Sequence, residues 1–177
     1  VYKRQFFGGS YAGKLAPKVE DFSVILLIIS CVIGVVIQII VHEAGHLVFG
    51  LLTGYKFVSF RVFDFKLEKD SNNKFKLRLQ HMRGTLGQCL MKPPKYIEGK
   101  FQYKLYLAGG VLGNFIFSVA IWFIYPSIYT LMIVMIGIIF GISNAIPSGF
   151  NDGMTYKLST QDETNKYVLY LTLVVNY

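Results

Sequence analysis

The longest apolar stretch of the 177-residue chain lies between Asp21 and Lys56, where Glu43 is the only Asp, Glu, Lys or Arg. An α-helix crosses the hydrocarbon core of a bilayer in about 20 residues, so this stretch is long enough to span one. The composition agrees, because 53% of the residues are hydrophobic and the mean hydropathy is +0.46. The stretch therefore predicts a first membrane-spanning helix at about residues 24–52.

Two further apolar stretches have the length of a membrane span. We expect helices at about 105–125 and 128–146, ended by Pro126 and Pro147 respectively, because proline cannot continue a helix. Only two residues separate them, so the two helices should pack antiparallel. Both contain glycines at the i, i+4 spacing that lets helix backbones approach closely in lipid, at Gly109 and Gly113 and at Gly137 and Gly141.

The segment between the first two spans, residues 54–104, is basic, with twelve Lys or Arg and four Asp or Glu. Apolar residues alternate with polar ones over 58–62, shift phase by one residue, and alternate again over 63–67 and 75–79. This period of two predicts a β-hairpin at about 57–80 with a bulge at the phase shift, and Gly and Pro predict irregular backbone over 83–94. From the excess of Lys and Arg we expect this segment to lie on the cytoplasmic side and against anionic headgroups.

The two ends of the chain need separate treatment. Residues 1–5 resemble the translation of an adapter used in sequencing libraries, and residues 6–23 are a lead-in. Residues 154–177 predict a polar loop and a truncated fourth span, so we interpret the chain as a fragment. The predicted fold is a mainly α, polytopic transmembrane protein, with a three-helix core at 24–153 and a β-hairpin between its first two helices.

The first span contains the sequence HEAGH, with His42 and His46 four residues apart and Glu43 beside them. On a helix both imidazoles leave the same face and can bind one Zn²⁺, with Glu43 as proton acceptor for a metal-bound water. The motif lies about ten residues, or roughly 15 Å, from the helix end, deep in the membrane. Alternatively, the histidines bond to a neighbouring helix with Glu43 as counter-ion. Because each ionisable group there costs roughly 2.5–3.5 kcal/mol, we favour the metal.

A third protein ligand is needed, and Asp152, just after the break at Pro147, is the best candidate. Asp152 could instead be a helix N-cap or turn residue, and both roles could hold at once. His81, in the basic segment, is expected to be an ordinary surface histidine. Cys31 and Cys89 should lie at different depths and are not expected to pair, and Cys89 has no second Cys or His at ligand spacing.

Three motifs in this order resemble the site-2 protease family of intramembrane zinc metalloproteases: HEAGH at 42–46, Gly110-x-x-x-Asn114, and Asn144-x-x-Pro147-x-x-x-x-Asp152-Gly153. The resemblance covers about residues 24–153. It implies a bacterial, multi-pass cell-membrane enzyme that hydrolyses peptide bonds of transmembrane or membrane-bound substrates. It further implies the roles of the site residues: Zn²⁺ ligands His42, His46 and Asp152, general acid/base Glu43, and substrate or oxyanion contacts Asn114 and Asn144.

The chain departs from the family pattern at three positions, with Asn151 in place of Leu, Gly149 in place of a second Pro, and Val111 in place of Pro. No PDZ-like insertion separates the second and third helices, which corresponds to a compact form of the family. The substrate must be unwound before cleavage, and we expect it to add as a strand to an exposed edge of the hairpin at 57–80.

Two other functions compete with the protease: a non-catalytic membrane zinc-binding protein and an ion transporter. A transporter should carry charges in several spans, and the second and third predicted helices have none. The expected partners are the lipid bilayer and a membrane-bound substrate, with no nucleic acid.

Overall fold

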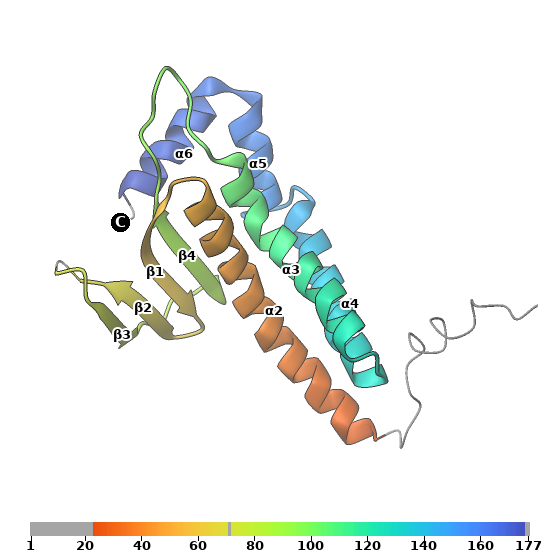
Figure 1. Cartoon of the computed structure of the whole chain (residues 1–177). Coiled ribbons are helices and arrows are strands. Elements are labelled where there is room, and N and C mark those ends of the chain that lie inside the picture. The colour runs from red at the N-terminus through yellow and green to blue at the C-terminus, as the bar shows by residue number, and fades with distance from the viewer. Residues whose placement is uncertain (1–22, 71, 176–177) are drawn as a thin grey trace, which may run out of the picture.

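The computed structural model describes residues 23–70 and 72–175 (Figure 1). The expectations for residues 1–5 and for nearly all of the lead-in therefore lie outside the described residues. The described helices are α2 (Val24–Leu52), α3 (Lys104–Ile124), α4 (Ile128–Ala145), α5 (Asp152–Gln161) and α6 (Glu163–Val175). The described strands are β1 (Lys56–Val62), β2 (Phe65–Lys69), β3 (Phe75–Leu79) and β4 (Gly87–Lys92).

Three of the described helices, α2, α3 and α4, are long and apolar enough to cross a membrane. Their bounds agree within one residue with those predicted. Serines fix two of the starts, because the Ser23 hydroxyl accepts from the N–H of Leu26 at 3.4 Å and the Ser127 hydroxyl from that of Thr130 at 3.1 Å. The coarse prediction of a mainly helical chain with three candidate membrane spans and a small β element is confirmed.

α2 and α3 approach each other so closely that only glycine fits at their contact. A Cβ added at Gly45 would lie 2.1 Å from the carbonyl oxygen of Gly109, and one at Gly113 would lie 2.9 Å from that of Val41. This confirms the close packing predicted from the first glycine pair. The contact surrounds the HEAGH motif and sets its distance from α3.

The second glycine pair lies where α4 meets α3, alongside which it runs in Figure 1. A Cβ at Gly137 would lie 2.1 Å from the Ser118 hydroxyl, and one at Gly141 would lie 2.8 Å from the Phe115 ring. α4 is thus also held closely to the bundle, and side chains of its neighbours occupy the space that the glycines leave.

The β element is a four-stranded antiparallel sheet in the order β3-β2-β1-β4 rather than a single hairpin. The phase shift is a two-residue turn, not a bulge, because Val62 pairs with Phe65 and the intervening Phe63 has a φ of +51°. An irregularity in register lies instead between Phe57 and Ser59, opposite β4. The sequence predicted irregular backbone over the residues that form β4. They form a strand because their backbone groups pair with β1, which lies far away in the chain.

β4 runs beside the C-terminal half of α2, as Figure 1 shows. The hydroxyl of Tyr106 on α3 donates to the carbonyl of Cys89 at 2.9 Å, and the Tyr55 and Tyr106 rings stack with centroids 4.5 Å apart. These contacts belong to a buried apolar cluster that joins sheet and helices, made of Tyr55, Cys89, Met91, Tyr103, Tyr106 and Leu107. The cluster fixes the sheet against the helices next to HEAGH.

The polar stretch after α4, where the sequence predicted a loop, forms helix α5 and leads into α6. Asn151 caps α5, and the hydroxyl of Tyr103 donates to the carbonyl of Ser159 at 3.1 Å, which ties α5 to the start of α3. α6, in the region of the expected fourth span, has 13 described residues, fewer than a span needs. It packs through Tyr170 against the rings of Tyr96 and Phe101.

Candidate metal centre

The two histidines of HEAGH point the same way from α2, as their spacing predicts. The Nε2 atoms of His42 and His46 lie 3.3 Å apart, and the rings meet edge to face with centroids 4.9 Å apart. Both residues are buried, at 9% and 7% exposure. Two imidazole nitrogens of a single helix therefore meet in the interior of the molecule.

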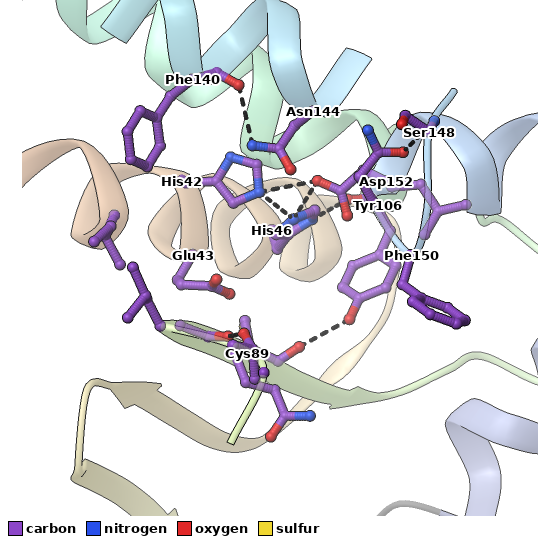
Figure 2. Close-up of a pocket in the computed structure, with 18 residues that line it drawn as sticks. His42, Glu43, His46, Cys89, Tyr106, Phe140, Asn144, Ser148, Phe150 and Asp152 are labelled. Carbon is purple, nitrogen blue, oxygen red and sulfur yellow. Dashed lines mark hydrogen bonds and ion pairs between the residues drawn. The ribbon is translucent and has the colours of Figure 1, made fainter. Parts of the chain in front are cut away.

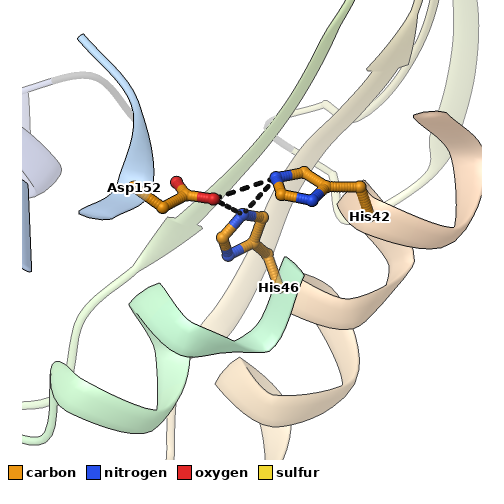
Figure 3. A group of neighbouring side chains, drawn as sticks. All are labelled: His42, His46 and Asp152. Carbon is orange, nitrogen blue, oxygen red and sulfur yellow. Dashed lines mark hydrogen bonds and ion pairs between the residues drawn. The ribbon is translucent and has the colours of Figure 1, made fainter. Parts of the chain in front are cut away.

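Asp152, the first residue of α5, completes a group of three (Figure 3). Its Oδ2 lies 2.9 Å from Nε2 of His42 and 3.2 Å from Nε2 of His46. Within the described ranges, these three residues form the only group of three or more His, Cys, Asp or Glu side chains placed to hold a metal. The structure thus brings together all three of the ligands expected from the sequence.

The hydrogen bonds on the far side of each ring determine which nitrogen carries the proton. Nδ1 of His42 lies 2.8 Å from Oδ1 of Asn114, and Nδ1 of His46 lies 2.8 Å from the carbonyl oxygen of Tyr106. Both partners accept, so each Nδ1 carries the hydrogen and each neutral ring presents a lone pair at Nε2. Oδ2 of Asp152 is buried and has no hydrogen-bond partner.

Three acceptors therefore face one another, which fits a bound cation. A single proton could satisfy only one of the contacts at a time, whereas a cation is shared by all three. Tetrahedral Zn²⁺ with bonds of about 2.0–2.1 Å requires ligand atoms about 3.3 Å apart, close to the separations of 2.9, 3.2 and 3.3 Å given above. The donor set of two imidazoles and one carboxylate is also one that Zn²⁺ takes in catalytic sites.

Gly110 on α3 provides the space in which the two imidazoles meet. A Cβ at this position would lie 2.4 Å from Cε1 and 2.5 Å from Nε2 of His42, and 2.6 Å from Nε2 of His46. Any side chain here would occupy the place of the ring nitrogens. The first residue of the Gly-x-x-x-Asn motif is therefore required by the geometry of the metal centre.

Asn151 rather than Asp152 caps helix α5. Its Oδ1 accepts from the N–H of Met154 at 2.9 Å, and its Nδ2 donates to the carbonyls of Ser143 and Ile146, both at 2.7 Å. One side chain thus joins the end of α4 to the start of α5. The cap role considered for Asp152 falls to its neighbour, which leaves the Asp152 carboxylate directed at the histidines.

A cavity of about 710 Å³ lies between β4 and the three candidate ligands His42, His46 and Asp152 (Figure 2). Glu43, which is 8% exposed, lies on its wall with His42 and His46, and residues 84–89 form the opposite wall. A Cβ at Gly87 would lie 2.4 Å from Oε1 of Glu43, so the backbone of β4 lies directly against the carboxylate. Glu43 is thus beside the three ligands without being one of them.

The two asparagines expected to contact substrate have different surroundings. Asn144 lies on the cavity wall near the end of α4, with its Nδ2 donating to the carbonyl of Phe140 at 3.0 Å. Asn114 is fully buried behind His42 and is not among the cavity-lining residues. This placement gives Asn114 a contact with a metal-binding ring rather than with the cavity.

The remaining candidates lie outside the metal-binding group. His81 is exposed, with Nδ1 2.9 Å from Oδ1 of Asp64. Cys31 and Cys89 are both free. Burial, together with the nearby charge of Glu43, raises the pKa of the Cys89 thiol to about 12, and Cys89 is not part of the group of three candidate ligands.

Three contributors to the site were not predicted. The carbonyl of Tyr106 and the backbone at Gly87 act through the main chain, so residue type gives no signal for them. Gln38 is different: its Oε1 accepts from Nδ2 of Asn114, the residue that bonds to His42. It lies four residues before His42 on the same helix face, and that spacing could have identified it.

No protein-family model, curated protein or solved structure matched the chain. The motifs and the geometry of the candidate metal centre are therefore the features that indicate a function.

Proposed function

We propose that the chain is the catalytic core of an intramembrane zinc metalloendopeptidase of the site-2 protease type, acting on transmembrane or membrane-bound substrates. The observation that carries the proposal is the convergence of His42, His46 and Asp152 with Glu43 in one cavity. Three ligands leave one position of a tetrahedral Zn²⁺ for water or substrate, as catalytic zinc sites do. The order of the three sequence motifs supports the same family.

Bound zinc would supply Lewis-acid chemistry, lowering the pKa of water to about 7 and polarising the scissile carbonyl. Glu43 takes a proton from the attacking water and delivers it to the nitrogen of the leaving amine. The water oxygen is added to the carbonyl carbon and the C–N bond breaks. Asn144, on the cavity wall, contacts the substrate chain on the side of α4.

A non-catalytic zinc-binding protein would need the same three ligands. Zinc binding alone does not account for the carboxylate of Glu43, which lies beside the three ligands in a cavity with room for a peptide. The position of Glu43 therefore favours hydrolysis.

The test is zinc content and cleavage in detergent, measured on purified protein. We expect about one Zn²⁺ per chain and cleavage of some members of a panel of synthetic single-span peptides with Gly or Pro at mid-segment. Removal of zinc with 1,10-phenanthroline should abolish cleavage, and added Zn²⁺ should restore it. A protein without bound zinc, or cleavage that the chelator leaves unchanged, would contradict the proposal.

The sheet indicates where an extended substrate binds. A peptide bond in a helix is shielded, so the segment must unwind and its backbone must find new partners. β4 is an edge strand, and its residues Gly87, Gln88 and Cys89 line the cavity. The hairpin expected from the sequence contributes the other edge of the sheet, strand β3, which lies farthest from β4 in the strand order. The substrate therefore adds as a strand to β4 rather than to the hairpin.

Strand addition predicts that substrate amides differ in importance with a period of two. N-methylation of every second amide on one side of the scissile bond should lower kcat/KM about 10-fold, because those N–H groups bond to β4. Methylation of the intervening amides is the matched control and should have little effect. Equal sensitivity at successive positions would argue against strand addition.

A further inference from the structure

A second polar group is buried behind His42, on the side away from Asp152. Gln38 and Asn114 are both fully buried, although each carries an amide. Nδ2 of Asn114 donates to Oε1 of Gln38 at 2.7 Å and to the Gln38 carbonyl at 2.9 Å. Its Oδ1 accepts from Nδ1 of His42 at 2.8 Å. The two amides thus form a chain that ends on a metal-binding ring.

The contacts of Gln38 with α4 fix the orientation of both amides. Nε2 of Gln38 lies 3.2 Å from the carbonyl oxygen of Ile133 on α4 and 3.3 Å from the Ser118 hydroxyl. A backbone carbonyl only accepts, so the NH₂ end of Gln38 must face α4 and its oxygen must face Asn114. Asn114 in turn meets two acceptors on Gln38, so its NH₂ faces Gln38 and its oxygen faces His42.

Helix α4 leaves room for the two hydrogen-bonded amides. A Cβ at Gly137 on α4 would lie 2.3 Å from Nε2 of Gln38, so only glycine permits the Gln38 amide to reach Ile133. In an apolar interior an unpaired amide costs free energy, and here each end of both amides is paired. The hydrogen bonds thus join three helices: they run from a backbone carbonyl of α4, through the amides of Gln38 and Asn114, to the imidazole of His42.

We infer that Gln38 is a positioning residue for the metal centre: it holds the Asn114 amide in the orientation that keeps the proton of His42 on Nδ1 and the lone pair on Nε2. If the Asn114 amide turned over, its NH₂ would face Nδ1, which would then have to accept. The proton would move to Nε2 and block the metal-binding position. The inference rests on the metal-binding half of the proposed function and does not depend on proteolysis.

The first test is zinc affinity of the purified full chain in detergent, measured by competition with a zinc-binding fluorescent indicator. Gln38→Met keeps the side-chain length and removes the amide, and we expect affinity to fall about 10-fold, the lower end of the range for partners of metal-binding histidines. Gln38→Leu serves as a second variant. Ser30→Ala is the control on the same helix, because the Ser30 hydroxyl donates to the Leu26 carbonyl within α2, and affinity should not change.

The second test uses a double-mutant cycle with Asn114→Ala, which removes the amide that Gln38 is inferred to orient. Asn114→Ala alone should lower zinc affinity about 10-fold, because Nδ1 of His42 loses its hydrogen-bond partner. Gln38→Met added to Asn114→Ala should lower affinity less than about twofold further, because Gln38 then has no amide to orient. If Gln38 acted only through packing, Gln38→Met would lower zinc affinity by the same factor of about 10 in both backgrounds.

The outcomes separate this inference from the proposed function. Equal losses in both backgrounds, or no loss from Gln38→Met and Gln38→Leu, would overturn the inference and leave the protease proposal intact. A parent chain that binds zinc but cleaves no peptide would overturn proteolysis alone. A parent chain that binds no zinc would overturn both.

Discussion

Replacement of Glu43 by Gln is expected to lower kcat by about 10³-fold while zinc remains bound, in the range typical of general acid–base catalysis. The amide has the same shape as the carboxylate but cannot take a proton from water. The three ligand atoms come from other residues, and Glu43 lies against β4 rather than between them. The site should therefore keep its metal and lose its proton acceptor.

The measurement is cleavage of whichever panel peptide the parent cleaves, together with zinc content of the same sample. Glu98→Gln is the matched control, because Glu98 is exposed, lies in the connection before α3, and is not among the residues that line the cavity. Parental cleavage by Glu43→Gln would show that another group accepts the proton.

Gly110→Ala is expected to lower zinc affinity at least about 100-fold, although it removes no ligand, because coordination requires ring nitrogens within about 2.1 Å of the metal. The added methyl would lie 2.5 Å from Nε2 of His42 and 2.6 Å from Nε2 of His46, closer than atoms can approach without bonding. At least one ring must turn away. The loss should approach that of Asp152→Ala, which removes a ligand outright.

The same indicator competition measures this loss, with far-UV circular dichroism to show that the helices persist. Val119→Ala, on the same helix α3, is the control and should bind zinc as the parent does, because Val119 is exposed and is not among the residues that line the cavity. If Gly110→Ala kept parental affinity, the two histidines would not meet at α3 as described.

The parts of the fold that depend on local sequence could be predicted. Apolar runs of spanning length and the prolines after them determined the helix bounds, and the i, i+4 spacing placed His42 and His46 on one face. Asp152 was found because Pro147 breaks the helix just before it. The candidate metal-binding group therefore follows from short-range chemistry, although its meeting point lies between distant segments.

The parts that depend on distant pairing could not be predicted. A bulge and a two-residue turn both shift an alternating pattern by one residue, and only the register of Val62 with Phe65 distinguishes them. β4 forms because β1 offers an open edge. The polar segment forms α5 because Asn151 bonds to carbonyls of α4, a contact that the residue types alone do not show.

The position of Asp152 has a consequence for the biosynthesis of the proposed enzyme. HEAGH emerges from the ribosome with the first span, whereas the third ligand is translated only after α4 and is then held in place by Asn151. Until α5 has docked, the nascent chain carries two imidazoles and no complete site for the ion. The three candidate ligands can therefore meet only after α2, α3 and α4 have all been synthesised.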